Sequence, residues 1–255
     1  MTSPEVTPVM LIAGGSGSIG SVLAAQAIAN GWRVALHGRR AERVESACTA
    51  IREHFSSAIV SGHCADFSTG EAIAALVAEV GAKHGRIDAI VDCSTGGPRG
   101  ITGLFAETDP TAFAEFAAQS VVVLQRLAHA GLPWLRATRG SLLAVVSDAG
   151  IYAAPRQALI GSMRAAAIGF IRNLASELAA EGIRANAISP SFVEDTAIVA
   201  RLDAASPSRL EKARRHAGLG LPNRTDVARL ALFLSSADAA RITGQIISIN
   251  GGLNN

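Results

Sequence analysis

The sequence predicts an α/β protein with a doubly wound parallel sheet of Rossmann type, folded as a single domain. A glycine-rich turn lies between an apolar run at 9–12 and an alanine-rich, helix-like run at 22–29. After this turn, strand-length apolar runs alternate with helix-length segments to the end of the chain. Hydrophobic residues make up 49% of the 255 residues, which is enough for one extended core. We therefore expect one domain over residues 1–255.

The turn reads Gly14-Gly15-Ser16-Gly17-Ser18-Ile19-Gly20. Its glycines fit two spacings, G-x-G-x-x-G from Gly15 and G-x-x-G-x-x-G from Gly14. Such a turn lets backbone amides approach a diphosphate and directs the partly positive N-terminus of a helix at the anion. The turn favours a dinucleotide site. A glycine turn that only packs a helix on a sheet is the alternative.

The remaining elements follow in order. Strands are expected at 33–37, 58–62, 87–92, 141–146, 183–188 and 245–249. Helices are expected from about 39 to 54, 68–83, 110–130, 157–180 and 225–235. Thr69 is a predicted N-terminal cap, and Pro110 stands early in its helix, where its missing N–H costs little. The polar segment 194–219 reads as mobile, without a regular element.

Composition limits the classes of partner. The net charge is +2 and the basic residues are scattered, so neither nucleic acid nor a membrane surface is expected as a partner. No apolar run approaches the roughly 18 residues of a membrane span, and residues 1–8 lack the pattern of an export signal. We expect a soluble, cytoplasmic protein. Cys48, Cys64 and Cys93 have the spacing of neither a disulfide framework nor a metal site, so no metal is expected.

Several motifs together resemble the short-chain dehydrogenase/reductase family over nearly the whole chain. They are the glycine turn, Asp66, Ile87-Asp88, the stretches 140–150 and 182–190, Thr243-Gly244-Gln245 and Gly251-Gly252. The resemblance implies a Rossmann-type sheet, NAD or NADP as cofactor, and reduction of ketones or oxidation of alcohols. It divides the chain into a nucleotide half at about 9–150 and substrate-side loops with oligomer helices at about 151–255.

The resemblance also implies the cofactor-binding residues. Gly14 and Gly20 match the family's turn, and Ser18 stands where a glycine is usual. NAD-preferring members carry an acidic residue at the position of Gly38, whereas here Arg39 follows and can pair with a 2′-phosphate. NADP is therefore expected, with NAD as the alternative, and solvated charges are the alternative role for Arg39 and Arg40. The implied contacts are Gly14, Ser16, Gly17, Ser18, Ile19, Gly20, Arg39, Arg40, Asp66, Phe67, Cys93, Pro190 and Val193.

The catalytic positions depart from the family pattern. The family uses a tyrosine as proton donor, a lysine four residues later and an orienting serine. Ser147 matches the serine, but Ile160 and Arg164 stand at the tyrosine and lysine positions. Ser120 replaces the asparagine of the relay, and Asp92-Cys93-Ser94-Thr95 replaces the usual Asn-Asn-Ala-Gly loop. Isoleucine has no proton to give, and arginine is not a compact ammonium group.

Three hypotheses follow. The first is a subunit of an oxidoreductase that has lost its proton relay and pairs with an active paralogue. The second is an active NADP-linked reductase or isomerase with an unconventional donor, either Tyr152, the one tyrosine of the chain, or Asp148. The third is a protein similar to halohydrin dehalogenases, or a nucleotide sensor. Arg99, Arg156 and Arg164 are candidates for an anionic substrate group, or are solvated.

Assembly is suggested by the helix at 159–180, which is apolar around most of its circumference and rich in small residues. The Ala/Val-rich run 116–123 has the same character, and the resemblance implies a bundle of such helices with a second subunit. We expect a dimer or tetramer, of the chain itself or with an active paralogue.

Overall fold

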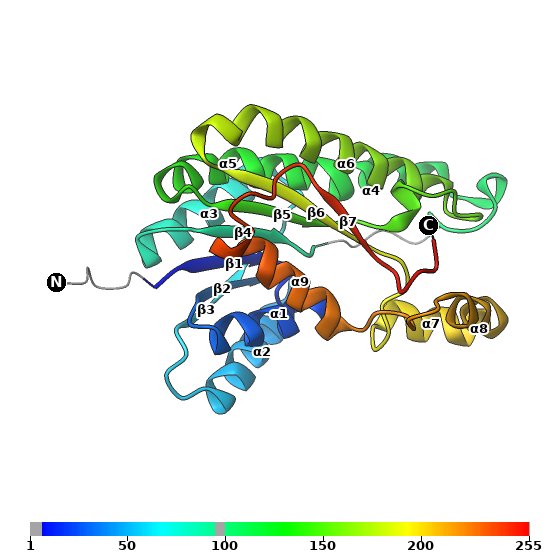
Figure 1. Ribbon diagram of the computed structural model, residues 1–255, viewed down its shortest axis with the longest axis horizontal. Coiled ribbons are helices and arrows are strands. Elements are labelled where there is room, and N and C mark those ends of the chain that lie inside the picture. The colour runs from blue at the N-terminus through cyan, green and yellow to red at the C-terminus, as the bar shows by residue number, and fades with distance from the viewer. Residues whose placement is uncertain (1–6, 95–99, 255) are drawn as a thin grey trace.

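The computed structural model of the chain describes residues 7–94 and 100–254. Within these ranges one parallel sheet has the strand order β3-β2-β1-β4-β5-β6-β7. The strands are β1 (Val9–Ala13), β2 (Arg33–Gly38), β3 (Val60–Cys64), β4 (Ala89–Asp92), β5 (Ser141–Val145), β6 (Arg184–Pro190) and β7 (Ile246–Ile249). Helices cover both faces of the sheet (Figure 1), which confirms the predicted fold class.

Two layers of helices enclose the sheet. One layer is α1 (Ser18–Ala29), α2 (Ala41–His54) and α9 (Arg224–Ser235), and the other is α3 (Gly70–His84), α4 (Phe113–Ala117), α5 (Val123–Thr138) and α6 (Ala158–Leu178). The central strands are apolar on both faces because both are covered. In β1, Met10 and Ile12 belong to the core on the α1 side, whereas Leu11 and Ala13 belong to the core on the α6 side.

The strand order reverses beside β1. Its neighbours are β2 and β4, with Ile12 opposite Leu36 on one side and Ala13 opposite Asp92 on the other. Ligands of such sheets bind outside the carboxyl ends of the strands at this reversal. The helices α7 (Ala197–Ala205) and α8 (Pro207–His216) lie beyond the same edge, at the right of Figure 1.

The segment 194–219 differs from the prediction, because it forms α7 and α8. The hydroxyl of Thr196 accepts a hydrogen bond from the backbone N–H of Val199 and caps α7. Pro207 stands in the first turn of α8, and Leu210 and Ala213 are buried beneath that helix. Each helix is short and has only a narrow apolar side. The hydrophobic pattern of this polar segment is therefore too weak to predict either helix.

The helix predicted for 110–130 also differs from the structure, in which the helical segment is interrupted and extends to Thr138. A 3₁₀ turn (Pro110–Ala112) precedes α4, and a π turn (Ala118–Val122) separates α4 from α5. The helix continues through Gly131 and Pro133 because packing favours it there. A Cβ at Gly131 would lie 2.2 Å from Ile90 Cδ1, and Leu135 is buried in the core. Among the described residues no helix is long and apolar enough to cross a membrane.

A buried carboxylate joins the ends of three strands. Asp148, directly after β5, is 3% exposed. Its Oδ1 accepts from the hydroxyls of Ser189 and Ser248, both at 2.9 Å. Its Oδ2 accepts from the amides of Asn250 (2.6 Å) and Asn254 (3.2 Å). The side chain therefore ties β5 to β6, to β7 and to the C-terminal segment.

We expect Asp148→Asn to lower the free energy of unfolding by about 3 kcal/mol, because its new amide would face the donors of Asn250 and Asn254. Urea unfolding at pH 7 measures the change. Asp238→Asn is the matched control, since Asp238 is exposed and its carboxylate accepts no hydrogen bond within the described ranges. Equal, small effects of the two substitutions would contradict the assigned role.

Candidate functional site

The glycine turn brings the end of β1 against the loop after β4. Gly14 has a φ of +74°, and a Cβ there would lie 2.7 Å from the carbonyl oxygen of Cys93. A Cβ at Gly20 would lie 2.5 Å from the Gly14 carbonyl oxygen, so the first turn of α1 also needs a glycine. Gly17 is the N-cap of α1 and supplies no side-chain cap. The first N–H groups of α1 are therefore suited to an anion.

A cleft of about 670 Å³ opens beside this turn. Of the sequence-predicted residues it brings together Gly14, Ser16, Gly17, Arg39, Arg40, Asp66, Phe67 and Cys93. Five others do not line it. Ser18, Ile19 and Gly20 belong to the first turn of α1, Pro190 ends β6, and Val193 is buried in the core on the α1 side.

Three arginines line one end of the cleft. Arg39, Arg40 and Arg43 stand where β2 passes into α2, and no described acidic group forms an ion pair with any of them. A Cβ at Gly38 would lie 2.2 Å from the Ser16 hydroxyl oxygen, so that hydroxyl takes the space where an acidic side chain would begin. This end of the cleft is suited to a phosphate group.

His37 braces the same end and is a residue that sequence reasoning missed. Its Nδ1 accepts from the Gly14 N–H (3.3 Å), and its Nε2 donates to the Ala65 carbonyl oxygen (3.1 Å). The ring stacks on Phe67 with a centroid distance of 3.9 Å. Burial lowers the pKa of His37 from 6.5 to about 4, so the ring is neutral at pH 7. A histidine at the end of a strand carries no sequence signal for this role.

A buried acid ends β4, and a buried arginine lies on α6. Asp92, at the end of β4, accepts hydrogen bonds from the backbone N–H and the hydroxyl of Ser94. Burial raises the pKa of Asp92, and the positive charge of Arg164 opposes that rise. Burial likewise lowers the pKa of Arg164, and Asp92 opposes that shift. The two charges compensate each other in the interior.

The neighbouring positions are apolar or lack a partner. Ile160 packs against a small core cluster that contains Ile101 and Phe116. The Ser120 hydroxyl is buried in the π turn and has no hydrogen-bond partner in the described part of the chain. Gly150 lets the loop after β5 cross α6, since a Cβ there would lie 2.7 Å from Arg164 Cβ. No proton donor stands at position 160.

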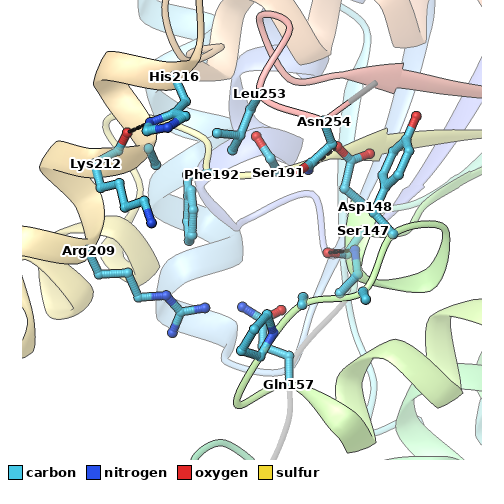
Figure 2. A pocket seen from close by; sticks show the side chains of 16 residues that line it. Ser147, Asp148, Gln157, Ser191, Phe192, Arg209, Lys212, His216, Leu253 and Asn254 are labelled. Carbon is cyan, nitrogen blue, oxygen red and sulfur yellow. Dashed lines mark hydrogen bonds between the residues drawn. The ribbon is translucent and has the colours of Figure 1, made fainter.

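A second cavity, of about 300 Å³, lies between the loop after β5 and α8 (Figure 2). Ser147 and Tyr152 both line it, together with Ser191 and Phe192 from the loop after β6. The Ser147 hydroxyl accepts from the Ala149 N–H at 3.3 Å. Asp148 also borders the cavity, but its carboxylate is engaged by the four donors already described.

Two of the three arginines considered for an anionic group, Arg156 and Arg164, line neither cavity. Arg156 is exposed and lies 3.7 Å from Glu107, and Arg164 is buried beside Asp92. Arg99 lies outside the described residues. The basic residues that do line the second cavity come from α8, which the sequence analysis assigned to a mobile segment. Across the described ranges no cluster of three or more candidate metal ligands is present.

A family model described as enoyl-(acyl carrier protein) reductase matches residues 13–254. The chain belongs to the short-chain dehydrogenase/reductase family. Nodulation protein G of Rhizobium sp. (strain N33) is 30% identical over 254 residues, which cover 95% of each protein. The chain is thus an oxidoreductase of this family's type.

Two solved structures of the family are similar to the chain. One is an NADPH-bound short chain oxidoreductase from Pseudomonas aeruginosa PAO1, described as containing an atypical catalytic center. It has a TM-score of 0.87 and 25% identity, with 97% of each chain covered. The other is ElxO with NADP bound, with a TM-score of 0.85 and 26% identity over 97% of this chain and 98% of that one.

We expect acid to destabilise the protein through His37. The unfolded state binds a proton below pH 6.5 and the folded state only below about pH 4, so stability falls as the pH falls between these values. The loss from this residue is about 3 kcal/mol at pH 4. Urea unfolding from pH 7 to pH 4 measures it, and His37→Gln should reduce the slope, leaving the part that the buried His63 and His84 contribute through their lowered pKa. His129→Gln, at an exposed histidine, should leave the slope unchanged; the same slope in all three proteins would exclude His37 as its source.

Proposed function

We propose that the chain binds NADP(H) and contributes to the reduction of a ketone or the oxidation of an alcohol. It does so as a subunit without the usual proton relay, paired with an active paralogue. The observation that carries the proposal is the composition of the relay site. Ile160 packs in an apolar cluster, and Arg164 is buried, with the charge of Asp92 opposing the effect of burial on its pKa.

The residues of the cleft fit NADP(H). The turn at Gly14 and Gly17 leaves the α1 N-terminus open to a diphosphate, and Ser16 with Arg39 provides donors for a 2′-phosphate. The NADP- and NADPH-bound relatives support this choice. When bound, the nicotinamide supplies or accepts a hydride.

NADP⁺ should bind more tightly than NAD⁺, and Arg39→Ala should remove the difference, because the phosphate then loses a bidentate partner. Calorimetry with each nucleotide measures both affinities, and we expect a preference of about tenfold or more. Arg52→Ala is the matched control, since Arg52 lies on α2, the helix that follows Arg39, and pairs with Glu45 away from the cleft. Equal affinities in the unmodified protein would contradict the assignment.

A second candidate function is that of an active enzyme with Tyr152 as proton donor. It is favoured by one observation, that Tyr152 and Ser147 line the same cavity. Asp148 is less suited to this role because four donors already hold its carboxylate. The two functions differ in whether the purified chain turns over a substrate alone.

The purified chain should show no turnover of ketones or alcohols with NADPH or NADP⁺, and Ser147→Ala should change nothing. A missing general acid lowers rates by about 10²–10⁴-fold. Ile160→Tyr with Arg164→Lys should restore measurable NADPH oxidation, followed at 340 nm. Robust turnover by the unmodified chain would overturn the subunit proposal, and its loss in Tyr152→Phe would establish the second candidate.

The oligomer proposal rests on α6. Ala165 and Ala166 are exposed on this helix, while Phe170 and Leu174 are half-buried at the edge of the core. A helix with apolar residues outside the core contact is suited to packing against another copy or a paralogue. The chain then forms a dimer or tetramer through α5 and α6.

Ala166→Arg should convert the oligomer to a monomer, because a buried charge without a partner is costly at an interface. Sedimentation at micromolar protein concentration, with and without the native partner, gives the measurement. Ala50→Arg, at an exposed position of α2 on the opposite layer, should leave the assembly intact. A monomeric unmodified protein with no partner in its native host would refute the proposal.

A further inference from the structure

The second cavity has one wall that carries positive charge. Arg209, Lys212 and His216 reach it from α8, whereas Ser147 and Gln157 stand on the opposite wall (Figure 2). The Arg209 guanidinium lies over the Phe192 ring, 5.8 Å from its centre, and this contact holds the arginine against the cavity wall. The His216 Nδ1 donates to the Lys212 carbonyl oxygen at 2.8 Å, which orients that ring.

The charges of this wall are not neutralised by the protein. In the ranges that the structure describes, neither Arg209 nor Lys212 takes part in an ion pair, although other cations of α8 do. Arg214 pairs with Glu194 at 2.8 Å, and Arg215 pairs with Glu211 at 2.6 Å. The α8 cations that do not line the cavity, Arg214 and Arg215, are thus paired with acidic side chains. Those that line it, Arg209 and Lys212, are not paired within the described ranges.

No free acid opposes these cations across the cavity. Asp148 is the one acidic residue that lines it among those described, and four donors hold its carboxylate. Ser191 also lines the cavity, and its buried hydroxyl has no hydrogen-bond partner among the described residues. The cavity therefore offers donors and positive charge without an internal acceptor.

We propose that this cavity binds a small organic anion, with its carboxylate or phosphate against Arg209 and Lys212 and its carbonyl or hydroxyl group toward Ser147. The inference deepens the proposed function and rests on it only for the reacting group, since the anion site itself needs no turnover. A volume of about 300 Å³ is at the lower end for ligand pockets and favours a small acid or the anionic end of a longer molecule.

Binding is tested by calorimetry on the full chain, with and without NADP⁺. The first probe is acetoacetate, a small 3-oxo acid, compared with its neutral methyl ester. The second is pantetheine 4′-phosphate compared with pantetheine. We expect the anion that carries the recognised group, carboxylate or phosphate, to bind about tenfold or more tightly than its neutral counterpart. The pair that shows the difference tells whether a carboxylate or a phosphate is recognised.

Arg209→Gln and Lys212→Gln should each weaken binding of the recognised anion by about tenfold. Arg215→Gln, on the same helix but paired with Glu211, should leave the affinity unchanged within about twofold. Circular dichroism checks that each variant is folded, and Lys212→Glu should abolish binding.

Equal binding of anions and neutral counterparts, no binding of either anion, or equal effects of Arg209→Gln and Arg215→Gln would overturn the inference. Anion binding without any nucleotide binding would leave this inference standing and refute the proposed function. Nucleotide binding without anion binding would do the reverse.

Discussion

The close approach of Gly14 to the backbone of Cys93 is the constraint on which the site depends. It joins the end of β1 to the loop after β4 at the point where the strand order reverses, and a Cβ at Gly14 would prevent it. The N-cap of α1 is Gly17, and no described side chain caps the helix, so the N-terminal amides of α1 remain available for an anion. His37 holds the turn from the other side by accepting from the Gly14 N–H. The shape of the cleft beside the turn therefore follows from backbone geometry more than from any one side chain.

Two buried carboxylates then give the carboxyl edge of the sheet its chemistry. The Asp148 carboxylate accepts four hydrogen bonds and fixes the strand ends. It therefore helps to shape the second cavity, but it is not free to bind a ligand there. Asp92 and Arg164 are both buried, and the charge of each opposes the effect of burial on the pKa of the other. A lone arginine in the interior would be costly, and Asp92 supplies the compensating charge.

The sequence predicted the alternation, the sheet and the glycine turn because each depends on local pattern. The family resemblance at Gly38 made Arg39 a candidate for the phosphate, and that role stays a prediction. It missed α7 and α8, whose apolar sides are only a few residues wide, and with them the cations at Arg209 and Lys212. It also missed His37 and the Asp92–Arg164 pair, since these depend on residues that are far apart in sequence. The continuation of α5 through Pro133 could not be predicted, because tertiary packing at Gly131 overrides the local signal to stop.

A crystal structure of the protein with NADP⁺ tests the central claim, that the glycine turn and the arginines beside it form a cofactor site. We expect density for the diphosphate at Gly14 and Gly17 and for the 2′-phosphate beside Ser16 and Arg39. An empty cleft at saturating NADP⁺, or a nucleotide whose 2′-phosphate lies away from Arg39, would contradict it.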